Sequence, residues 1–351
     1  EARIAVDIAG DEVAAAGRFV HIPEEWERAW RNRRGVTRVA QIASVILLVL
    51  LYLAGAVFAI VRWSRHQFAS STFAIFFAFM AIVGGLQIFN SFRTASAQFV
   101  TAQPFKLQTA ILIVGGLIAT TGIAAVSSLL IGLAHRLVPE QPGNADRATL
   151  AAGFGLGALL AALGSVGMSL VPSTMPSWPD LSSAGDFLPL LGTAFGTVTS
   201  WITGSALFLL AVLTLNTATG SWRRRKLFVS TVLVLFGLVV TGSEGVESIP
   251  IWLVEGGLTG VVLLAVWVLV LRHHPALVPA VTAAGSALGA FHEAIIRPYP
   301  GAAAGSVIGG LAVVAAAWWW NRRLTLDSRF QPEGISVPET VDQVAAMEED
   351  Q

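Results

Sequence analysis

The chain has 351 residues, of which 54% are hydrophobic and 13% charged, and its formal net charge is zero. The charged share is about half that of an ordinary soluble domain, which indicates a membrane protein. The neutral balance gives no reason to expect a nucleic-acid partner. Because cysteine is absent, disulfides and thiolate chemistry are excluded. The first residues are polar, so no signal peptide is predicted there, and we expect a removed leader or a longer chain.

Residues 1–37 are predicted to form an extramembrane segment. Hydrophobic alternation predicts two strands joined near Gly10 and Asp11. Pro23 then opens a segment with acidic residues first and arginines last, which predicts a short helix. A hairpin of this size is marginal alone. We therefore expect it to rest on the membrane domain or to belong to a larger domain.

Nine apolar stretches within residues 38–322 are long enough to cross a bilayer. A hydrocarbon core about 30 Å thick needs roughly 20 helical residues, and lipid admits such spans only as helices. We predict an all-α polytopic membrane protein with nine transmembrane helices, or eight if the eighth stretch is a buried or re-entrant segment rich in small residues. The predicted spans are 39–62, 71–92, 108–135, 148–170, 187–214, 227–243, 249–271, 276–296 and 302–320.

Residues 323–351 are polar and acidic, and we predict a flexible tail there. Within the spans, glycines recur four residues apart, at Gly153 and Gly157 and at Gly305 and Gly309. Such pairs let transmembrane helices approach closely. We interpret them as helix-packing positions rather than as part of a substrate path.

The positive charges predict the orientation in the membrane. Lys and Arg concentrate in cytoplasmic loops, and one set of alternate loops carries twelve of them against three in the other. This places the N-terminus outside and the C-terminus in the cytoplasm of a bacterial cytoplasmic (inner) membrane. Five arginines of the N-terminal segment and the first span's start disagree and leave an eight-span, N-inside arrangement open. The twelve are Arg62, Arg65, Arg136, Arg147, Arg223, Arg224, Arg225, Lys226, Arg272, Arg322, Arg323 and Arg329, the three are Arg93, Lys106 and Arg297, and the five are Arg28, Arg31, Arg33, Arg34 and Arg38.

Ionisable residues in or near spans are costly and are therefore candidates for function. Glu255 lies in the seventh span, and His292 and Glu293 lie near the end of the eighth. Each also has a structural interpretation, an interhelical hydrogen bond for Glu255 and interface packing for the other two. Two further carboxylates, Glu244 and Glu247, fall between the sixth and seventh spans, where an exposed loop would explain them.

Known catalytic patterns do not match. The sequence HEAII at 292–296 has Ile296 where a zincin needs histidine, and no metal or cofactor site is predicted. The sequence GSALG at 285–289 has its serine in the second place, whereas the GxSxG motif has it in the middle. A rhomboid-like serine protease would pair its serine with a histidine on another span, but Ser286 and His292 lie on the same short segment, so such a site is poorly supported.

Residues 10–34, GDEVAAAGRFVHIPEEWERAWRNRR, precede a long apolar span. This stretch resembles the junction between the extracytoplasmic region and the membrane domain in large bacterial members of the CPBP family. These are relatives of the CAAX-processing endopeptidases, which are intramembrane proteases. Residues 273–302 also look like the C-terminal spans of such proteins. The resemblance implies a multi-pass protein with its N-terminal segment outside the cell.

The catalytic motifs of that family are EExxxR, FxxxH and a further histidine motif, and none is intact here. Glu24 and Glu25 followed by Arg28 are one residue short and lie in the soluble segment. His292 and Glu293 followed by Arg297 have the right spacing, but histidine replaces the first glutamate. No catalytic residue can be transferred from the family to this chain.

These observations lead to three hypotheses for the function of the chain. The first is a non-catalytic scaffold or accessory subunit that contacts membrane lipids and other membrane-protein subunits. The alternative is an active intramembrane hydrolase in which Glu255, His292 and Glu293 activate water. The third is a small-solute transporter, which the nearly charge-free middles of the spans disfavour.

Overall fold

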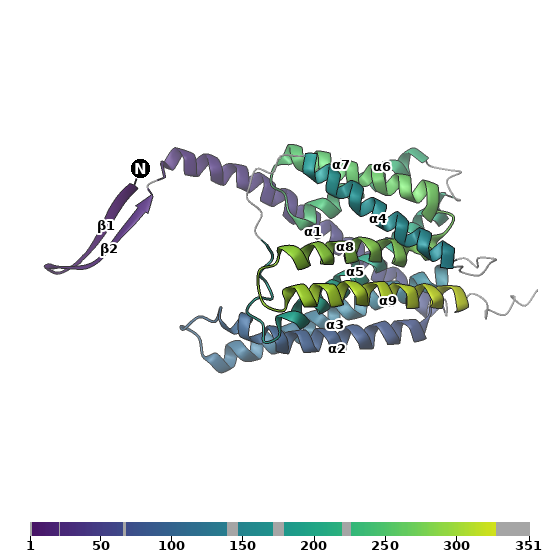
Figure 1. Ribbon diagram of the computed structural model, residues 1–351, viewed down its shortest axis with the longest axis horizontal. Coiled ribbons are helices and arrows are strands. Elements are labelled where there is room, and N and C mark those ends of the chain that lie inside the picture. Colours follow the sequence, from purple (N-terminus) through teal and green to yellow (C-terminus); the bar gives the residue numbers. More distant parts are fainter. Residues whose placement is uncertain are drawn as a thin grey trace, which may run out of the picture.

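The computed structural model describes residues 2–20, 22–65, 68–138, 147–170, 179–219 and 226–327. It consists of a helical bundle with a β-hairpin at its N-terminal end (Figure 1). The predicted acidic tail and most of the SWRRRK loop, of which Lys226 is described, lie outside these residues.

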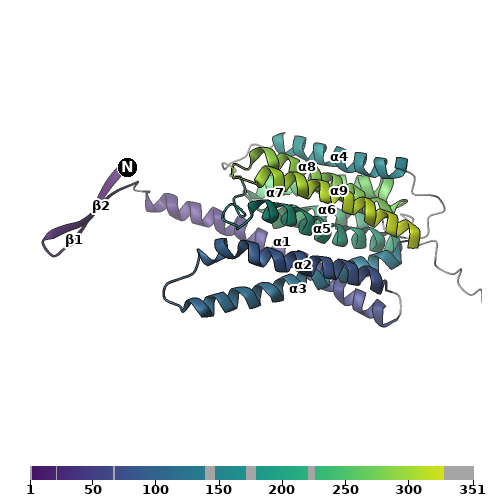
Figure 2. The same ribbon diagram turned by 60° about the horizontal axis from the view of Figure 1, so that its bottom comes forward.

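The hairpin confirms the two predicted strands. Strands β1 (Ala2–Ala9) and β2 (Glu12–Val20) pair antiparallel, with a register shift between Asp7 and Ile8. Gly10 supplies the positive φ of 71° that the tight turn needs. The hairpin projects away from the helices in both views, so it does not rest on the membrane domain (Figures 1 and 2).

Helix α1 (Glu24–Ser64) is one continuous helix of 41 residues. The prediction of a separate short helix before the first span was wrong, because the helical pattern continues through Gly35 without a break. Its polar first part is supported by ion pairs one turn apart, such as Arg28 to Glu24 at 3.5 Å. At 1.5 Å per residue α1 is about 60 Å long, so it extends well beyond one bilayer.

The remaining helices match the predicted spans closely. Eight of the helices in the described residues are long and apolar enough to cross a membrane, and α8 is the exception. The chain is therefore an all-α, multi-pass membrane protein apart from its hairpin. The helices are α2 (Ser70–Ser96), α3 (Phe105–Leu137), α4 (Arg147–Leu170), α5 (Pro189–Thr219), α6 (Lys226–Glu244), α7 (Ile249–Val266, continued by a π-helical turn at Trp267–Leu271), α8 (Val278–Ile296, preceded by a 3-10 turn at Pro275–Leu277) and α9 (Ala302–Asp327).

Helix α8 is the weakest span by composition, and its position explains why. It packs against α9, α4 and α5 and runs alongside α9 within the bundle (Figures 1 and 2). Val278 and Ala280, in its first turn, are fully buried. A helix covered by protein needs small residues for close packing rather than a continuous apolar surface.

The repeated glycines lie at close helix contacts. A Cβ on Gly157 of α4 would collide with the carbonyl oxygen of Val281 on α8. A Cβ on Gly305 of α9 would collide with the Thr193 hydroxyl on α5. These positions support the packing interpretation of the two glycine pairs.

The bundle has two ends. At the first, called here the hairpin end, α1 enters, and residues 97–104, 179–188, 245–248 and 297–301 connect the helices. The opposite end, called here the tail end, includes the turn at 272–277 and the C-terminal turns of α9.

Candidate ligand-binding site

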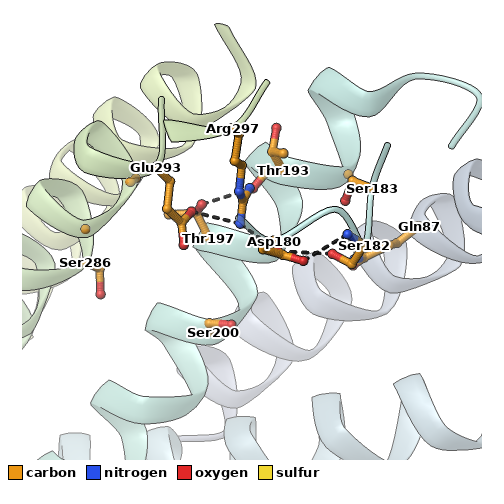
Figure 3. Close-up of a pocket in the computed structure, with 14 residues that line it drawn as sticks. Gln87, Asp180, Ser182, Ser183, Thr193, Thr197, Ser200, Ser286, Glu293 and Arg297 are labelled. Carbon is orange, nitrogen blue, oxygen red and sulfur yellow. Dashed lines mark hydrogen bonds and ion pairs between the residues drawn. The ribbon is translucent and has the colours of Figure 1, made fainter. Parts of the chain in front are cut away.

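A cavity of about 440 Å³ opens between α2, the 179–188 segment, α5 and α8 at the hairpin end (Figure 3). Its lining includes Ser200 on α5 and Ser286 on α8. Ser200 lies eleven residues after Pro189, and Ser286 lies eleven residues before Arg297. Eleven helical residues rise about 16 Å, so the cavity reaches roughly halfway through a bilayer core of about 30 Å.

The lining is polar although it lies between apolar helices. The side chains of Gln87, Ser183, Ser200 and Ser286 make no hydrogen bond to any other described residue. Thr193 is bonded instead to its own helix, donating to the Leu190 carbonyl at 3.0 Å. Polar groups in a cavity need a solvent or ligand partner when the protein provides none. The lining is therefore suited to binding a polar molecule.

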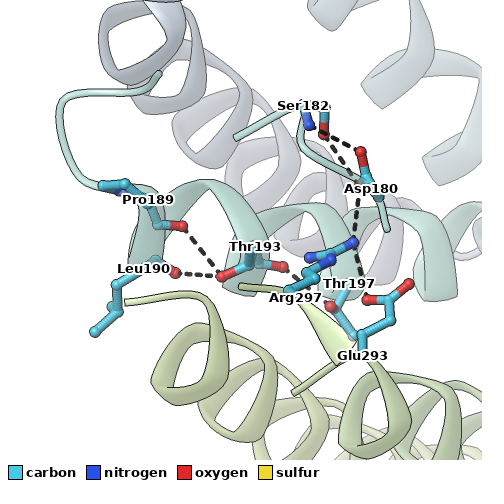
Figure 4. A network of polar contacts seen from close by, with 8 residues as sticks. All are labelled: Asp180, Ser182, Pro189, Leu190, Thr193, Thr197, Glu293 and Arg297. Atoms are coloured by element: carbon cyan, nitrogen blue, oxygen red, sulfur yellow. Dashed lines mark hydrogen bonds and ion pairs between the residues drawn. The ribbon is translucent and has the colours of Figure 1, made fainter. Parts of the chain in front are cut away.

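Arg297 lies at the mouth of the cavity between two carboxylates (Figure 4). Its Nη2 donates to Asp180 Oδ2 at 2.8 Å and lies 3.0 Å from Glu293 Oε2. The Arg297 side chain is only 8% exposed, and its Nε has no hydrogen-bond partner among the described residues. The charge-assisted contact with Asp180 joins the 179–188 segment to the end of α8, and the contact with Glu293 is made within the last turn of α8.

The electrostatics of Asp180 agree with this pairing. Partial burial raises the pKa of the Asp180 carboxyl, but hydrogen bonds from the Ser182 backbone and hydroxyl and the charge of Arg297 outweigh it. The net effect is a pKa below the ordinary value. Asp180 is therefore held as a carboxylate next to the cavity.

A second polar network attaches the 179–188 segment to α2. Asn90 donates from Nδ2 to Asp186 Oδ2 at 3.2 Å, and its Oδ1 accepts from the Leu188 backbone N–H at 2.8 Å. The Thr94 hydroxyl donates to the other Asp186 oxygen at 2.9 Å. Burial raises the pKa of Asp186, and the Thr94 hydrogen bond opposes that rise. This network positions one wall of the cavity.

The three candidate residues Glu255, His292 and Glu293 lie in different places relative to the cavity. Glu293 lines the cavity, whereas the adjacent His292 is exposed and lies outside the lining. Glu255 lies on α7, which packs mainly against α6. The cavity therefore brings in one of the three side chains, and they do not gather there as a single site.

The other two carboxylates are also outside the cavity. Glu244 is the last residue of α6, and Glu247 precedes α7, which Ser248 caps by accepting from the Ile251 N–H at 3.4 Å. Glu247 and Glu255 thus do not lie on one unbroken helix, as Pro250 indicated. In the part of the chain that the structure describes, no three His, Asp or Glu side chains gather as a metal site.

Sequence reasoning missed most of the lining. Its signal is a stripe of small and polar residues at helical spacing, which the search for charged residues passed over. On α5 the stripe is Thr193, Gly196, Thr197 and Ser200, and on α8 it is Ser286, Gly289 and Glu293, continued by Arg297 directly after the helix.

Comparison of the chain with family models, with curated proteins and with solved structures found no match.

Proposed function

We propose that this chain is a non-catalytic accessory subunit of a bacterial membrane complex, and that it binds a polar ligand in the cavity at its hairpin end. The proposal retains the resemblance to CPBP proteins as a relationship of architecture and not of chemistry. The observation that carries it is the ion pair between Glu293 and Arg297 at the mouth of a polar cavity.

The state of Glu293 favours binding over hydrolysis. A general base must be free to take a proton from water or from a nucleophile next to the substrate. One Glu293 oxygen is instead held 3.0 Å from a guanidinium that also contacts Asp180. His292, the nearest candidate partner in sequence, is exposed outside the lining. A carboxylate held in this way is suited to shaping and charging a binding site.

The N-terminal hairpin supports the role of a subunit. Ile4 and Ile8 are each 68% exposed and Val13 is 64% exposed. A two-stranded sheet with such apolar side chains in water gains stability when another surface covers it. The positive charges at the tail end favour an orientation in which the hairpin and the cavity mouth lie outside the cell.

The cavity can be tested by thiol labelling of the full chain, because no native cysteine interferes. Ser286→Cys should react with a membrane-impermeant methanethiosulfonate reagent on protein purified in detergent. Adding Gly289→Leu should slow the reaction at least several-fold, because Gly289 lines the cavity and a Cβ there meets no atom within 4 Å. Adding Gly115→Leu, on the exposed face of α3 with equally open surroundings, should leave the rate unchanged.

Catalysis is tested separately with a reporter peptide substrate in proteoliposomes. We expect no cleavage that depends on Glu293, so wild type and Glu293→Gln should give equal background. Cleavage by wild type that Glu293→Gln abolishes at equal folded yield would overturn the non-catalytic proposal. An unreactive Ser286→Cys would overturn the binding proposal.

A further inference from the structure

The charged groups around the cavity sum to one net negative charge. Asp180 and Glu293 contribute two negative charges and Arg297 one positive charge, which leaves −1. The other polar side chains of the lining are neutral hydroxyl and amide groups. A partly enclosed polar site with excess negative charge favours a cation over a neutral or anionic molecule of the same shape.

One carboxylate oxygen remains available to a ligand. Both Asp180 oxygens already accept hydrogen bonds, from the Ser182 N–H and from the Ser182 hydroxyl and Arg297. Glu293 uses Oε2 for Arg297, and its Oε1 makes no hydrogen bond or ion pair with another described residue. Glu293 Oε1 is thus an ionic acceptor in the cavity wall, and it suits an ammonium group, which has only donors to offer.

The neutral side chains of the lining add a second requirement. The hydroxyls of Ser200 and Ser286 and the amide of Gln87 make no hydrogen bond to another described residue. Polar groups in a cavity need a partner from the solvent or from a ligand. A ligand that carries an oxygen close to its ammonium group would satisfy them.

We propose that the cavity binds a small ligand that carries a primary ammonium group beside a hydroxyl or other acceptor oxygen, as in amino alcohols and amino sugars. The ammonium group contacts Glu293 Oε1, and the unpaired hydroxyls of Ser200 and Ser286 bind the acceptor oxygen and the remaining polar atoms. This inference rests on the proposed function and adds the charge class of the ligand to it.

The first test measures the charge preference without a ligand. On detergent-solubilised Ser286→Cys protein, the rate of labelling by a cationic methanethiosulfonate is divided by the rate of labelling by an anionic one, which gives a charge-preference ratio. Both reagents attack the same thiolate, so its fraction cancels in the ratio. We expect the ratio to exceed that of Ala15→Cys, on the exposed hairpin, by roughly three- to tenfold at low salt.

Glu293→Gln in the Ser286→Cys background should bring the ratio down to the hairpin value. Its matched control is Glu27→Gln, which breaks a similar pair one turn apart, with Arg31 at 3.6 Å, outside the cavity on α1. The control should leave the ratio unchanged.

The second test compares three ligands of one shape. Glucosamine should protect Ser286→Cys from labelling at concentrations roughly tenfold below those needed for glucose, and glucuronate should protect least. Glu293→Gln should remove the difference between glucosamine and glucose. Phosphatidylethanolamine added to the detergent forms a parallel arm, and protection by it but not by glucosamine would assign the ammonium group to a lipid headgroup.

The outcomes separate the two proposals. The ammonium inference would be overturned if Gly289→Leu slowed labelling but the labelling rate did not depend on the charge of the reagent. It would also be overturned if glucose protected as well as glucosamine. Either result would leave the binding function intact. Absence of labelling at Ser286→Cys would overturn both.

Discussion

Arg297 and Asp180 are 117 residues apart in the sequence, yet the Arg297 Nη2 donates to Asp180 Oδ2 at 2.8 Å. Asp180 precedes α5, and Arg297 follows α8 directly. The contact therefore joins two connections at the hairpin end across the mouth of the cavity (Figures 3 and 4). The shape of the site depends on a pairing that neither local sequence specifies.

Replacing Arg297 by Met should destabilise the protein. The change keeps an unbranched side chain but removes the guanidinium, which leaves Asp180 and Glu293 as neighbouring carboxylates without their shared cation. Because Asp180 is 50% exposed, solvent screens part of the loss, and we expect a cost of about 1–3 kcal/mol. The midpoint of thermal unfolding in detergent measures the effect.

Arg31→Met provides the matched comparison, since Arg31 pairs with Glu27 at 3.6 Å and both side chains are well exposed. An exposed pair contributes at most about 1 kcal/mol. Equal melting temperatures for Arg297→Met and Arg31→Met would show that the buried contact does not hold the segment in place.

Asp186 gives a pH dependence with a definite sign. Burial raises its pKa above the ordinary value of 3.8, so the folded protein holds the proton more tightly than the unfolded chain. Its contribution to stability is fully present below pH 3.8 and is lost as the pH rises through the folded-state pKa.

Asp186→Asn should remove this trend, because the amide does not titrate. The melting temperature of wild type minus that of Asp186→Asn should therefore fall as the pH rises from 3.5 to about 6. Asp11→Asn, in the exposed hairpin turn, should leave the slope of the wild-type curve unchanged. A difference that grows with pH would mean that Asp186 is stabilised as a carboxylate.

Two glycines on α4 test the close contact with α8. Gly157→Leu should be strongly destabilising, because even a Cβ would collide with the Val281 carbonyl oxygen, and backbone cannot move aside as a side chain can. Gly155→Leu adds the same side chain two residues earlier, where nothing lies within 4 Å. Folded yield by size-exclusion chromatography should separate the two variants. Similar yields would contradict the packing role of Gly157.

The sequence predicts most of the fold because the bilayer limits the choices. Long apolar stretches must be helices. The observed bounds of α2 and α6 and the start of α9 lie within a few residues of the predicted ones, whereas α9 extends further at its C-terminal end than predicted. The prediction was wrong where no bilayer rule applies. The polar part of α1 was expected to be a separate helix, but extending the helix of the apolar span into it avoids the cost of starting a second one.

The site was harder to predict, because it depends on tertiary contacts between neutral residues. Glu293 was found through its charge, and the same criterion selected Glu255 and His292, which lie elsewhere. A serine such as Ser286 carries little information alone, since a transmembrane helix commonly satisfies its hydroxyl internally. It becomes informative only when α5 and α8 are seen to face each other across a cavity.

The orientation of the bundle leads to the last prediction. Among the described loop-flanking residues, the tail end carries Arg62, Arg65, Arg136, Arg322 and Arg323, whereas the hairpin end carries Arg93, Lys106 and Arg297 besides the arginines of the first part of α1. Lys and Arg residues of short loops are retained on the cytoplasmic side during insertion. The tail end should therefore face the cytoplasm and the cavity mouth should face outward.

Two single-cysteine variants test this orientation in whole cells, with any outer membrane opened. An impermeant maleimide should label Ser182→Cys, in the segment before α5, and should miss Ser221→Cys, in the loop before α6 that lies outside the described residues. Lysing the cells should make position 221 reactive, which controls for a buried thiol. The reverse pattern would place the cavity mouth in the cytoplasm, where its ligand would have to be an intracellular amine. Labelling of both positions in intact cells would mean that α5 does not cross the membrane.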